Sequence, residues 1–423
     1  MDVYLTFALA VTGLSLLAWM WFVLGRGFYW KIDQILRIPN FPEPANEDDW
    51  PTVKIIVPAR NEAEILPITL PSLLNQEYPG SVSVFLVDDQ STDGTREIAI
   101  GLGREHGPKQ QLRVLTGEPL PPGWTGKLWA LEQGVRAGSS IQTEGGPVEF
   151  LLFTDADISH PPESLRSLVS KALTDELDLV SVMARLQVST SWERLLIPAF
   201  VYFFAKLYPF RWVNDPSRST AAAAGGCVLL RCDALFHAGG LERISGEIID
   251  DCALAGLIKN SRRPGGGRIW LGLAHDLRSL RSNSSLRDIW EMVARTAYAQ
   301  LGHSPAMLPV TVVGLSLVYL APVGGAIGGL AAGIIDQDSA LALPRLVAGF
   351  LAWVLMAGSY LPTLKRYGLP PILAFALPVA AGLYTLMTID SARRSWQGRG
   401  ANWKGRTYPP PPRENQPRSG ETK

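Results

Sequence analysis

Acidic side chains occur in two short clusters, each directly after an apolar run. Asp88 and Asp89 form the first cluster, and Asp155 and Asp157 form the second. Carboxylates that lie at neighbouring strand ends repel one another unless a cation or hydrogen-bond donors lie between them. Mg²⁺ or Mn²⁺ prefers oxygen ligands and bridges phosphate oxygens, so a divalent metal carrying a diphosphate would compensate this charge. The pattern predicts that Asp155-x-Asp157 holds a metal and that Asp89 accepts hydrogen bonds from a base or a ribose.

The first cluster has a structural alternative. In the stretch VDDQSTDGT, residues 87–95, Ser91 or Asp93 would accept hydrogen bonds from the free amides of a helix that begins near Arg96. A helix cap explains this one stretch, but it does not explain a second acidic cluster at another strand end.

Short apolar runs alternate with helical patterns in the middle of the chain. We expect strands at Thr52–Pro58, Ser83–Val87, Arg113–Thr116 and Phe150–Phe153, and helices at Ala63–Asn75, Thr95–Gly103 and Lys127–Arg136. This alternation predicts an α/β fold with a doubly wound, mostly parallel sheet. In such sheets ligands bind beyond the carboxyl ends of the strands, where both acidic clusters lie.

The apolar residues that remain are gathered into long runs. Val3–Leu24 carries no charge and is long enough to cross a hydrocarbon core of about 30 Å, which predicts an anchor within residues 1–27. A cleaved signal peptide is the alternative, but no Lys or Arg precedes the run. Three further uncharged runs predict a membrane region over residues 306–390, with soluble core helices as the alternative: Ala306–Ile335, Leu346–Leu364 and Tyr367–Ile389. Pro322–Gly325 interrupts the longest run and predicts a broken, tilted or re-entrant helix.

Charge sets an expectation for the sides of the membrane. Basic residues follow the first and the last apolar run: Arg26, Lys31 and Arg37, then Arg393, Arg394, Arg399, Lys404 and Arg406. The positive-inside tendency therefore predicts a multi-pass inner-membrane protein with its soluble domain and its basic, Pro-rich tail, residues 391–423, in the cytoplasm. Three simple C-terminal crossings would put the tail on the opposite side, unless the longest run enters and leaves on one face.

Composition excludes other classes of protein. Lys plus Arg and Asp plus Glu each number 39, so the zero formal charge gives no indication of a nucleic-acid partner. The three cysteines have no metal-ligand spacing, which indicates neither a disulfide framework nor a zinc site.

Six motifs follow one another in an order and spacing that resemble glycosyltransferase family 2. They are VPARNE (57–62), VDDQSTDGT (87–95), GWTGKLWALEQG (123–134), TDAD (154–157), GGCVLLRCDALFHAGG (225–240) and IIDDCAL (248–254). The resemblance covers residues 50–300 and implies a GT-A domain, a nucleotide-diphosphate sugar donor, typically a UDP-sugar, and Mg²⁺ or Mn²⁺. Together with the anchor and the motif GRGANWKGRTYP, the chain also resembles the hopanoid-biosynthesis-associated branch, which implies a hopanoid or a related polycyclic alcohol as the acceptor.

The resemblance implies roles for particular residues. Asp251 takes the place of the family's catalytic base, and Asp250 takes the place of the Glu beside it. A carboxylate suits this role because the acceptor hydroxyl must lose its proton as it attacks. Asp155 and Asp157 match the metal-binding pair, with Asp157 as the more direct ligand. The implied nucleotide-sugar-binding residues are Pro58, Arg60, Glu62, Asp88, Asp89, Lys127, Asp155, Gly225, Gly226 and Arg295.

Each assignment has an alternative that needs no ligand. Asp250 and Asp251 would cap a helix at Cys252–Lys259, and Lys127 would be a surface lysine. The two glycines would form a plain turn, and Arg295 would form a salt bridge on a helix surface.

Two further features bear on the acceptor. Many polymerising relatives carry a Gln-x-x-Arg-Trp motif, but here MVART supplies Met292, Arg295 and Thr296, which favours the transfer of one sugar over polymer synthesis. Leu195–Ala205 is too short to span a membrane and has basic and aromatic flanks, which predicts a helix at the membrane surface that admits a lipid. A buried core helix is the alternative.

Other functions remain open at this stage. A metal-dependent nucleotidyltransferase also uses paired acids on an α/β sheet, although it needs no Asp-Asp base before a helix. A polysaccharide-synthase-like transferase is a second possibility. A noncatalytic membrane scaffold or transporter component would carry charged or polar pathway residues in its apolar runs, and these runs contain no charge.

Overall fold

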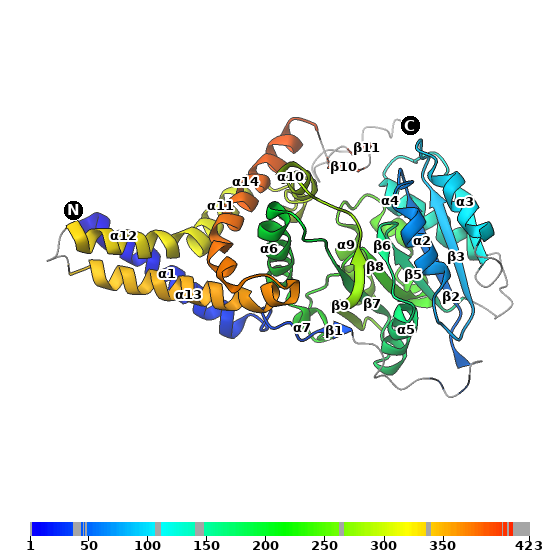
Figure 1. The fold of residues 1–423 in the computed structure, drawn as a ribbon, viewed down its shortest axis with the longest axis horizontal. Helices are drawn as coiled ribbons and strands as arrows, with labels where there is room; N and C mark the ends of the chain where they lie inside the picture. Colours follow the sequence, from blue (N-terminus) through cyan, green and yellow to red (C-terminus); the bar gives the residue numbers. More distant parts are fainter. Residues whose placement is uncertain are drawn as a thin grey trace, which may run out of the picture.

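The computed structural model describes residues 2–36, 44, 46, 49–105, 111–139, 148–261, 266–335, 340–399, 401–403 and 406–408. Within these ranges the molecule is elongated (Figure 1). An α/β domain forms one end, and long apolar helices extend from it to the other end, where the chain begins.

One nine-stranded sheet forms the centre of the α/β domain, in the order β1-β9-β7-β8-β5-β2-β3-β4 with β6 beside β9. The strands are β1 (Ile35–Leu36), β2 (Val53–Ala59), β3 (Val82–Asp88), β4 (Gln111–Thr116), β5 (Phe150–Thr154), β6 (Ile158–Ser159), β7 (Leu179–Arg185), β8 (Cys227–Arg231) and β9 (Ile269–Ser279). Only β8, against β5 and β7, and β6, against β9, pair antiparallel among the described strands of this sheet. The predicted α/β, mostly parallel sheet is confirmed.

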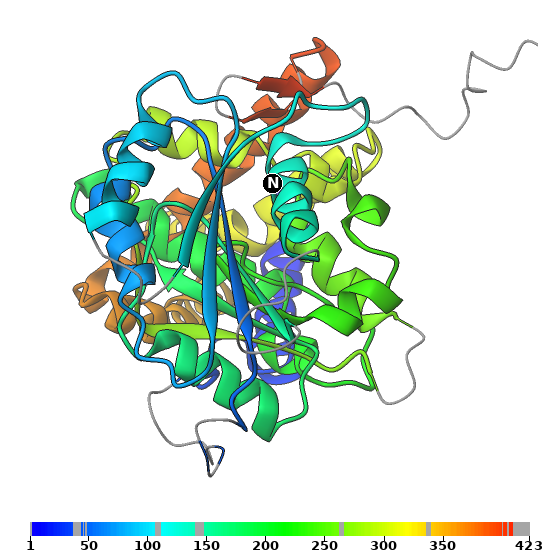
Figure 2. The same ribbon diagram turned by 90° about the vertical axis from the view of Figure 1, so that its right-hand side faces the viewer.

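The helices cover both faces of the sheet (Figure 2). Helices α2 (Leu66–Leu74), α3 (Thr95–Glu105) and α5 (Ser164–Thr174) pack on one face, and α4 (Gly126–Ser139), α8 (Cys232–His237) and α9 (Asp250–Lys259) pack on the other. Successive strand side chains point to opposite faces. Accordingly, Ile55 and Val57 belong to the hydrophobic core under α2, α3 and α5, and Ile56 belongs to the core under α4, α8 and α9. All three side chains are buried.

Helix α2 begins later than Ala63, the predicted start. The backbone amides of Asn61, Glu62 and Ala63 donate hydrogen bonds to the side chains of the 91–95 loop, so they are not available for a helical turn. This arrangement joins the loops that follow β2 and β3. It also holds both loops at the carboxyl edge of the sheet.

Helix α6 (Ser191–Leu207) connects the sheet to the long apolar helices. Its apolar side chains Leu196, Val201 and Tyr202 are buried, and the helix packs against α10 (Leu286–Ala294), α13 (Ala342–Tyr367) and α14 (Leu377–Trp396). The prediction of a helix that lies at the membrane surface is therefore wrong, and the alternative of a buried helix is right. Side chains of α10, α13 and α14, rather than lipid, cover this apolar run.

Glu193 fixes the start of α6. Its carboxylate accepts hydrogen bonds from the backbone amides of Ser189 (2.8 Å), Thr190 (3.0 Å) and Asn283 (2.9 Å), and the residue is fully buried. The Thr190 hydroxyl accepts a hydrogen bond from the Glu193 amide, which completes a capping box. One carboxylate thus joins the start of α6 to the segment that follows β9.

Replacing Glu193 by alanine is expected to destabilise the fold. The substitution leaves three partly buried amides without their acceptor, and the free energy of unfolding should fall by about 2–4 kcal/mol. Thermal unfolding of the detergent-solubilised protein measures this loss. The Glu193→Gln variant keeps the side-chain shape and one acceptor, so it should lose less. An unchanged midpoint for Glu193→Ala would contradict the role of this cap.

Four helical segments are long and apolar enough to cross a membrane by length and composition: Tyr4–Gly25 in α1 (Asp2–Gly25), Met307–Ile335, Ala342–Tyr367 in α13, and Pro371–Trp396. The second comprises α11 (Met307–Leu315), the π-helical turn η5 (Ser316–Leu320) and α12 (Ala321–Ile335), and the fourth comprises η6 (Pro371–Ala376) and α14. No break occurs at Pro322–Gly325, which lie inside α12, although the π-helical turn η5 comes directly before this helix. Pro322 cannot donate to the Val318 carbonyl, but the Trp19 indole donates to it instead at 2.6 Å, and the helix continues.

Helices α1, α12 and α13 form a tight bundle. Gly325, Gly329 and Gly333 recur at four-residue spacing on α12, a pattern that lets helix backbones approach closely. A Cβ at Gly329 would lie 2.4 Å from the Leu346 nitrogen. Large apolar side chains such as Leu17, Ile334 and Phe350 point outward from the bundle and are exposed, as expected for a surface that contacts lipid.

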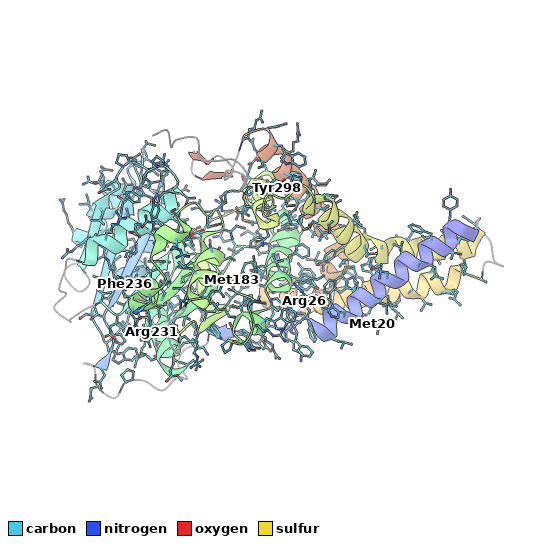
Figure 3. The ribbon with its side chains drawn as sticks, turned by 180° about the vertical axis from the view of Figure 1, so that it is seen from behind. Met20, Arg26, Met183, Arg231, Phe236 and Tyr298 are labelled. Carbon is cyan, nitrogen blue, oxygen red and sulfur yellow. The ribbon has the colours of Figure 1, made fainter. Side chains whose placement is uncertain are left out.

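Helix α14 takes a different course. It runs at an angle to the bundle and packs on α6, α10 and α11, so it lies along the α/β domain (Figure 1). Figure 3 shows the same junction from behind, with Arg26 at the base of α1 and Tyr298 beside α14. In the basic tail, β10 (Ala401–Trp403) and β11 (Arg406–Tyr408) pair antiparallel. The run Pro409–Pro412, Lys404 and Arg37 lie outside the described residues.

Candidate functional site

A cavity of about 490 Å³ lies at the carboxyl edge of the sheet, beside the start of α9. Segments far apart in the sequence meet here. The cavity is lined by these predicted site residues: Pro58, Glu62, Lys127, Asp155, Asp157, Gly225, Gly226, Asp250, Asp251 and Arg295. The other three predicted residues, Arg60, Asp88 and Asp89, do not line it.

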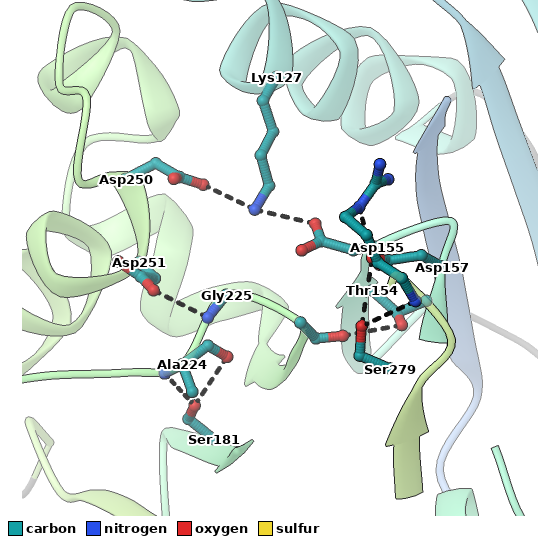
Figure 4. Close-up of polar contacts among 12 residues, drawn as sticks. Lys127, Thr154, Asp155, Asp157, Ser181, Ala224, Gly225, Asp250, Asp251 and Ser279 are labelled. Carbon is teal, nitrogen blue, oxygen red and sulfur yellow. Dashed lines mark hydrogen bonds and ion pairs between the residues drawn. The ribbon is translucent and has the colours of Figure 1, made fainter. Parts of the chain in front are cut away.

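Lys127 lies at the centre of the acidic residues (Figure 4). It comes from the first turn of α4, and its Nζ lies 2.9 Å from Asp155 Oδ1 and 3.2 Å from Asp250 Oδ2. Burial lowers the pKa of Lys127, but the carboxylates of Asp155, Asp250 and Asp251 oppose this effect and raise the pKa above its usual value. The alternative of a surface lysine is wrong, because a charged ammonium joins the two acidic segments.

Asp251 lies in the first turn of α9 and bonds to a different part of the chain. Its Oδ2 accepts a hydrogen bond from the Gly225 amide at 2.8 Å, and its Oδ1 accepts one from the Cys252 amide at 2.8 Å. The residue that caps α9 is Ile249, without a side-chain hydrogen bond, so neither aspartate is the N-cap. Burial and the neighbouring Asp250 raise the pKa of Asp251 to about 6, against the opposing effect of Lys127.

Gly225 allows the backbone to pass close to both charged groups. A Cβ on this residue would lie 3.0 Å from Lys127 Nζ and 3.2 Å from Asp251 Oδ2. Neither Gly225 nor Gly226 has a positive φ, so a turn conformation does not require glycine here. Close approach within the cavity is the reason for glycine at position 225.

Arg281 is a site residue that the sequence did not reveal. Its Nε lies 2.9 Å from Asp157 Oδ2, and its Nη2 lies 2.7 Å from Glu62 Oε1. Burial and Asp155 raise the pKa of Asp157, and the Arg281 guanidinium opposes that rise. The available signal is a basic residue two positions after the end of β9, but the sequence pattern does not predict this strand.

The acidic residues suit a metal that binds together with a phosphate ligand. Within the described ranges, no three or more His, Cys, Asp or Glu side chains group closely enough to hold a metal by themselves. Mg²⁺ typically uses one or two carboxylates plus substrate phosphates and water. Asp155 and Asp157 both line the cavity and supply the oxygen ligands that such an ion prefers.

The loops after β2 and β3 lie beside the cavity. Asp89 is fully buried, its amide donates to the Ala59 carbonyl at 2.8 Å, and the Arg60 guanidinium donates to the Asp89 carbonyl. Asp88 is also buried, and its Oδ1 has no hydrogen-bond partner among the described residues. Asp93 accepts hydrogen bonds from the Thr95 and Ala63 amides, so the structural alternative for this acid is correct.

Another part of the cavity lining is an apolar wall. It is formed by side chains from β7, α6 and α10 and from the segments beside β7 and α9: Met183, Leu186, Phe200, Phe204, Ile248 and Met292. Figure 3 shows Met183 on the side of the α/β domain that faces the junction with the apolar helices. The cavity thus combines a charged rim with an apolar wall, part of which is the helix that contacts α13 and α14.

Comparisons with known proteins agree with this arrangement. The model of the family "Glycosyl transferase family 2" matches residues 54–236. A Rhizobium sp. "N-acetylglucosaminyltransferase" is 28% identical over 149 residues, which are 34% of this chain and 30% of the relative. A Nostoc sp. "Beta-monoglucosyldiacylglycerol synthase" is 38% identical over 84 residues, 20% of this chain and 17% of the relative. The chain spans less than a third of the length of these curated relatives.

A solved structure shows the same fold. "Mannosyltransferase PcManGT from Pyrobaculum calidifontis in complex with GDP-Man and Mn2+" aligns with 89% of this chain and 99% of its own, with a TM-score of 0.50 and 20% identity. The likeness at this identity concerns the fold alone, a GT-A-like sheet with helices. Residues 54–236, which lie within the α/β domain, match the model of glycosyltransferase family 2, and the fold of this chain is the GT-A-like one.

Proposed function

We propose that this protein is a membrane-bound inverting glycosyltransferase that moves one sugar from a nucleotide-diphosphate sugar to a hydroxyl group of a lipid. One observation carries the proposal: Asp251, the paired acids Asp155 and Asp157, and an apolar wall all line a single cavity. A sugar donor needs the charged rim, and a lipid needs the apolar wall. Both substrates would therefore meet at Asp251.

The proposed reaction is a single displacement. The acceptor hydroxyl loses its proton to the Asp251 carboxylate while its oxygen forms a bond to the anomeric carbon. The bond from that carbon to the diphosphate oxygen breaks, and the nucleoside diphosphate leaves with the electron pair. Each oxygen of Asp251 accepts one backbone hydrogen bond and keeps a lone pair for the proton.

Cationic and acidic neighbours assist this reaction. Lys127 helps neutralise the charge of the diphosphate, and Gly225 leaves room for the donor sugar. A Mg²⁺ or Mn²⁺ ion, held by Asp155 and Asp157, would supply electrostatic stabilisation of the leaving diphosphate. Asp250 keeps the pKa of Asp251 high, which strengthens Asp251 as a base.

The lipid acceptor is supported by two observations. Met292 lines the apolar wall where polymerising relatives carry glutamine, so the site lacks a polar platform for a growing glycan. The Nostoc sp. relative is named "Beta-monoglucosyldiacylglycerol synthase", and the product in that name is a glycolipid. Within this class, we propose a UDP-sugar as the donor and, from the resemblance to the hopanoid-associated branch, a polycyclic alcohol as the acceptor.

The arrangement of the helices supports a definite placement in the inner membrane. Helix α1 begins at the end farthest from the α/β domain, and α12 ends and α13 begins at that same end (Figure 1). We propose that α1, α12 and α13 cross the bilayer and that α14 lies along its surface. The catalytic domain and the basic tail then share the cytoplasmic side, as the positive-inside tendency requires.

A panel of nucleotide sugars tests the proposed activity. Purified protein would be incubated with a bacterial lipid extract or a purified hopanoid alcohol, Mn²⁺, and UDP-, GDP- or dTDP-sugars labelled in the sugar. The expected result is one labelled glycolipid and release of the nucleoside diphosphate. Release of inorganic diphosphate from a nucleoside triphosphate, without a glycolipid, would instead identify a nucleotidyltransferase.

The pH dependence of transfer follows from Asp251. The base works only when it is ionised, so kcat/KM should fall as the pH drops through about 6. Asp250 raises the pKa of Asp251, so the Asp250→Asn variant should shift this acidic limb to lower pH. Rates measured between about pH 4 and pH 8, roughly two units on either side of this pKa, test both statements. An identical acidic limb in both proteins would contradict the coupling.

A further inference from the structure

A second cavity, of about 820 Å³, lies between α10 and the last turns of α14. It shares Ile248, Met292 and Arg295 with the lining of the first cavity, so the two spaces are neighbours on either side of these residues. The reaction proposed above does not use the rest of its lining. The charged side chains of this lining indicate the kind of ligand that the second cavity would bind.

The second cavity is rich in guanidinium groups. Arg295 comes from the end of α10, Arg393 and Arg394 from the last turn of α14, and Arg399 from the segment after it. Arg394 is neutralised by Glu291 and Asp390. The other three arginines form no ion pair among the described residues. Because four arginines but only two carboxylates, Glu291 and Asp390, line this cavity, it presents a net positive surface to a ligand.

His303 adds a hydrogen-bonding group to the same lining. Its Nδ1 is buried and has no hydrogen-bond partner among the described residues. The backbone of His303 has a φ of 53°, a conformation that is costly for a non-glycine residue. Tyr298 holds it there, since the Tyr298 hydroxyl donates to the His303 carbonyl at 2.9 Å and the two rings pack edge to face.

The position of the cavity points to a lipid. Helix α14 ends with these arginines after a long apolar run, and its Val379, Leu386 and Ile389 side chains are exposed. An apolar helix surface that leads to a group of arginines matches a lipid, with its chains against the helix and its anionic head among the guanidinium groups. Arginine forks suit phosphate oxygens in particular.

We propose that this arginine cavity binds a phosphate group carried by a membrane lipid, next to the site where the acceptor enters. The proposal goes beyond the transfer reaction and rests only on the proposed placement of α14 at the bilayer surface. A bound phospholipid would fill the space beyond Ile248 and Met292. It would thereby border the path of the acceptor toward the apolar wall of the catalytic cavity.

Native mass spectrometry of the full-length protein, without any sugar donor, tests the proposal. The protein would be titrated with dioleoyl phosphatidic acid, and the fraction that retains one lipid would be measured. The Arg393→Gln/Arg399→Gln variant should bind about 10-fold more weakly than the wild type, because two charge-assisted contacts are lost. Arg287→Gln, an exposed arginine of α10 outside both cavities, is the matched control and should bind like the wild type.

Several results would overturn the proposal. One is equal retention by the wild type and the Arg393→Gln/Arg399→Gln variant, and another is an equal loss in Arg287→Gln. If dioleoyl phosphatidylcholine bound as tightly as dioleoyl phosphatidic acid, the cavity would not select an anionic phosphate group. If equimolar inorganic phosphate displaced the lipid, the cavity would not require a phosphate group carried by a lipid.

The variant Arg393→Lys/Arg399→Lys keeps the charge and should retain lipid within a few-fold of the wild type. A loss as large as in the glutamine variant would also contradict the proposal. Since no transfer is measured, failure here leaves the proposed catalytic activity intact.

Discussion

The Asp251→Asn variant is expected to lose about 10²–10⁴-fold in kcat for sugar transfer, the usual contribution of a general base. Asparagine keeps the size of the side chain and one acceptor for the Gly225 or Cys252 amide, but it cannot take a proton. The Kd for the nucleotide sugar should change only a few-fold, because the role proposed for Asp251 is toward the acceptor. Radiolabelled transfer and calorimetric donor binding measure the two quantities separately.

The neighbouring acid provides the control for this prediction. Asp250→Asn removes a carboxylate from the same turn of α9 and leaves the base in place, so its loss in kcat should be much smaller. If both variants transferred sugar at the wild-type rate, Asp251 would not be the base. If Asp251→Asn lost donor binding to the same extent as transfer, the residue would serve the donor instead.

The Lys127→Met variant is expected to weaken binding of the nucleotide sugar by about 30-fold or more. Truncating one partner of a buried, hydrogen-bonded charge pair typically costs 2–5 kcal/mol, and here Asp155 and Asp250 would both lose their cation. Lys127 also lowers the pKa of Asp251. The acidic limb of the pH profile should therefore move to higher pH, in the direction opposite to that expected for Asp250→Asn.

Arg136→Met is the matched control for Lys127→Met. Arg136 lies on the same helix, α4, but its side chain is 59% exposed, and its contacts are an ion pair with Glu132 and a cation–π contact with Trp129. Its loss should therefore leave donor binding close to the wild type. Equal donor affinity in Lys127→Met and the wild type would show that Lys127 balances the acids without contributing to the donor site.

The acids of the site could be predicted from the sequence because the end of an apolar run marks the end of a strand. Apolar runs followed by Asp88, Asp89, Asp155 and Asp157 locate one edge of a parallel sheet, and the sheet brings those ends together. Arg281 could not be found in this way. It follows β9, a strand that lies between β1 and β7 in the sheet. The mostly apolar sequence of β9 fits a buried helix as well as a buried strand, so the sequence alone does not predict the strand.

The membrane-associated elements show a second limit of the sequence. The apolar run in α6 with its basic and aromatic flanks fits both a membrane surface and the space between two protein bodies, and only the positions of α13 and α14 decide between them. The break predicted at Pro322 is likewise prevented by a distant residue, Trp19, which satisfies the carbonyl that the proline leaves unpaired. Such contacts depend on tertiary structure, so local patterns do not contain them.

The configuration of the product at the anomeric carbon tests the central claim most directly. A single displacement with Asp251 as the base inverts this centre, whereas a mechanism with a covalent sugar–enzyme intermediate displaces twice and retains it. Proton NMR of the purified glycolipid made from an α-linked UDP-sugar reads out the outcome. We predict a β-linked product, and an α-linked product would contradict the account.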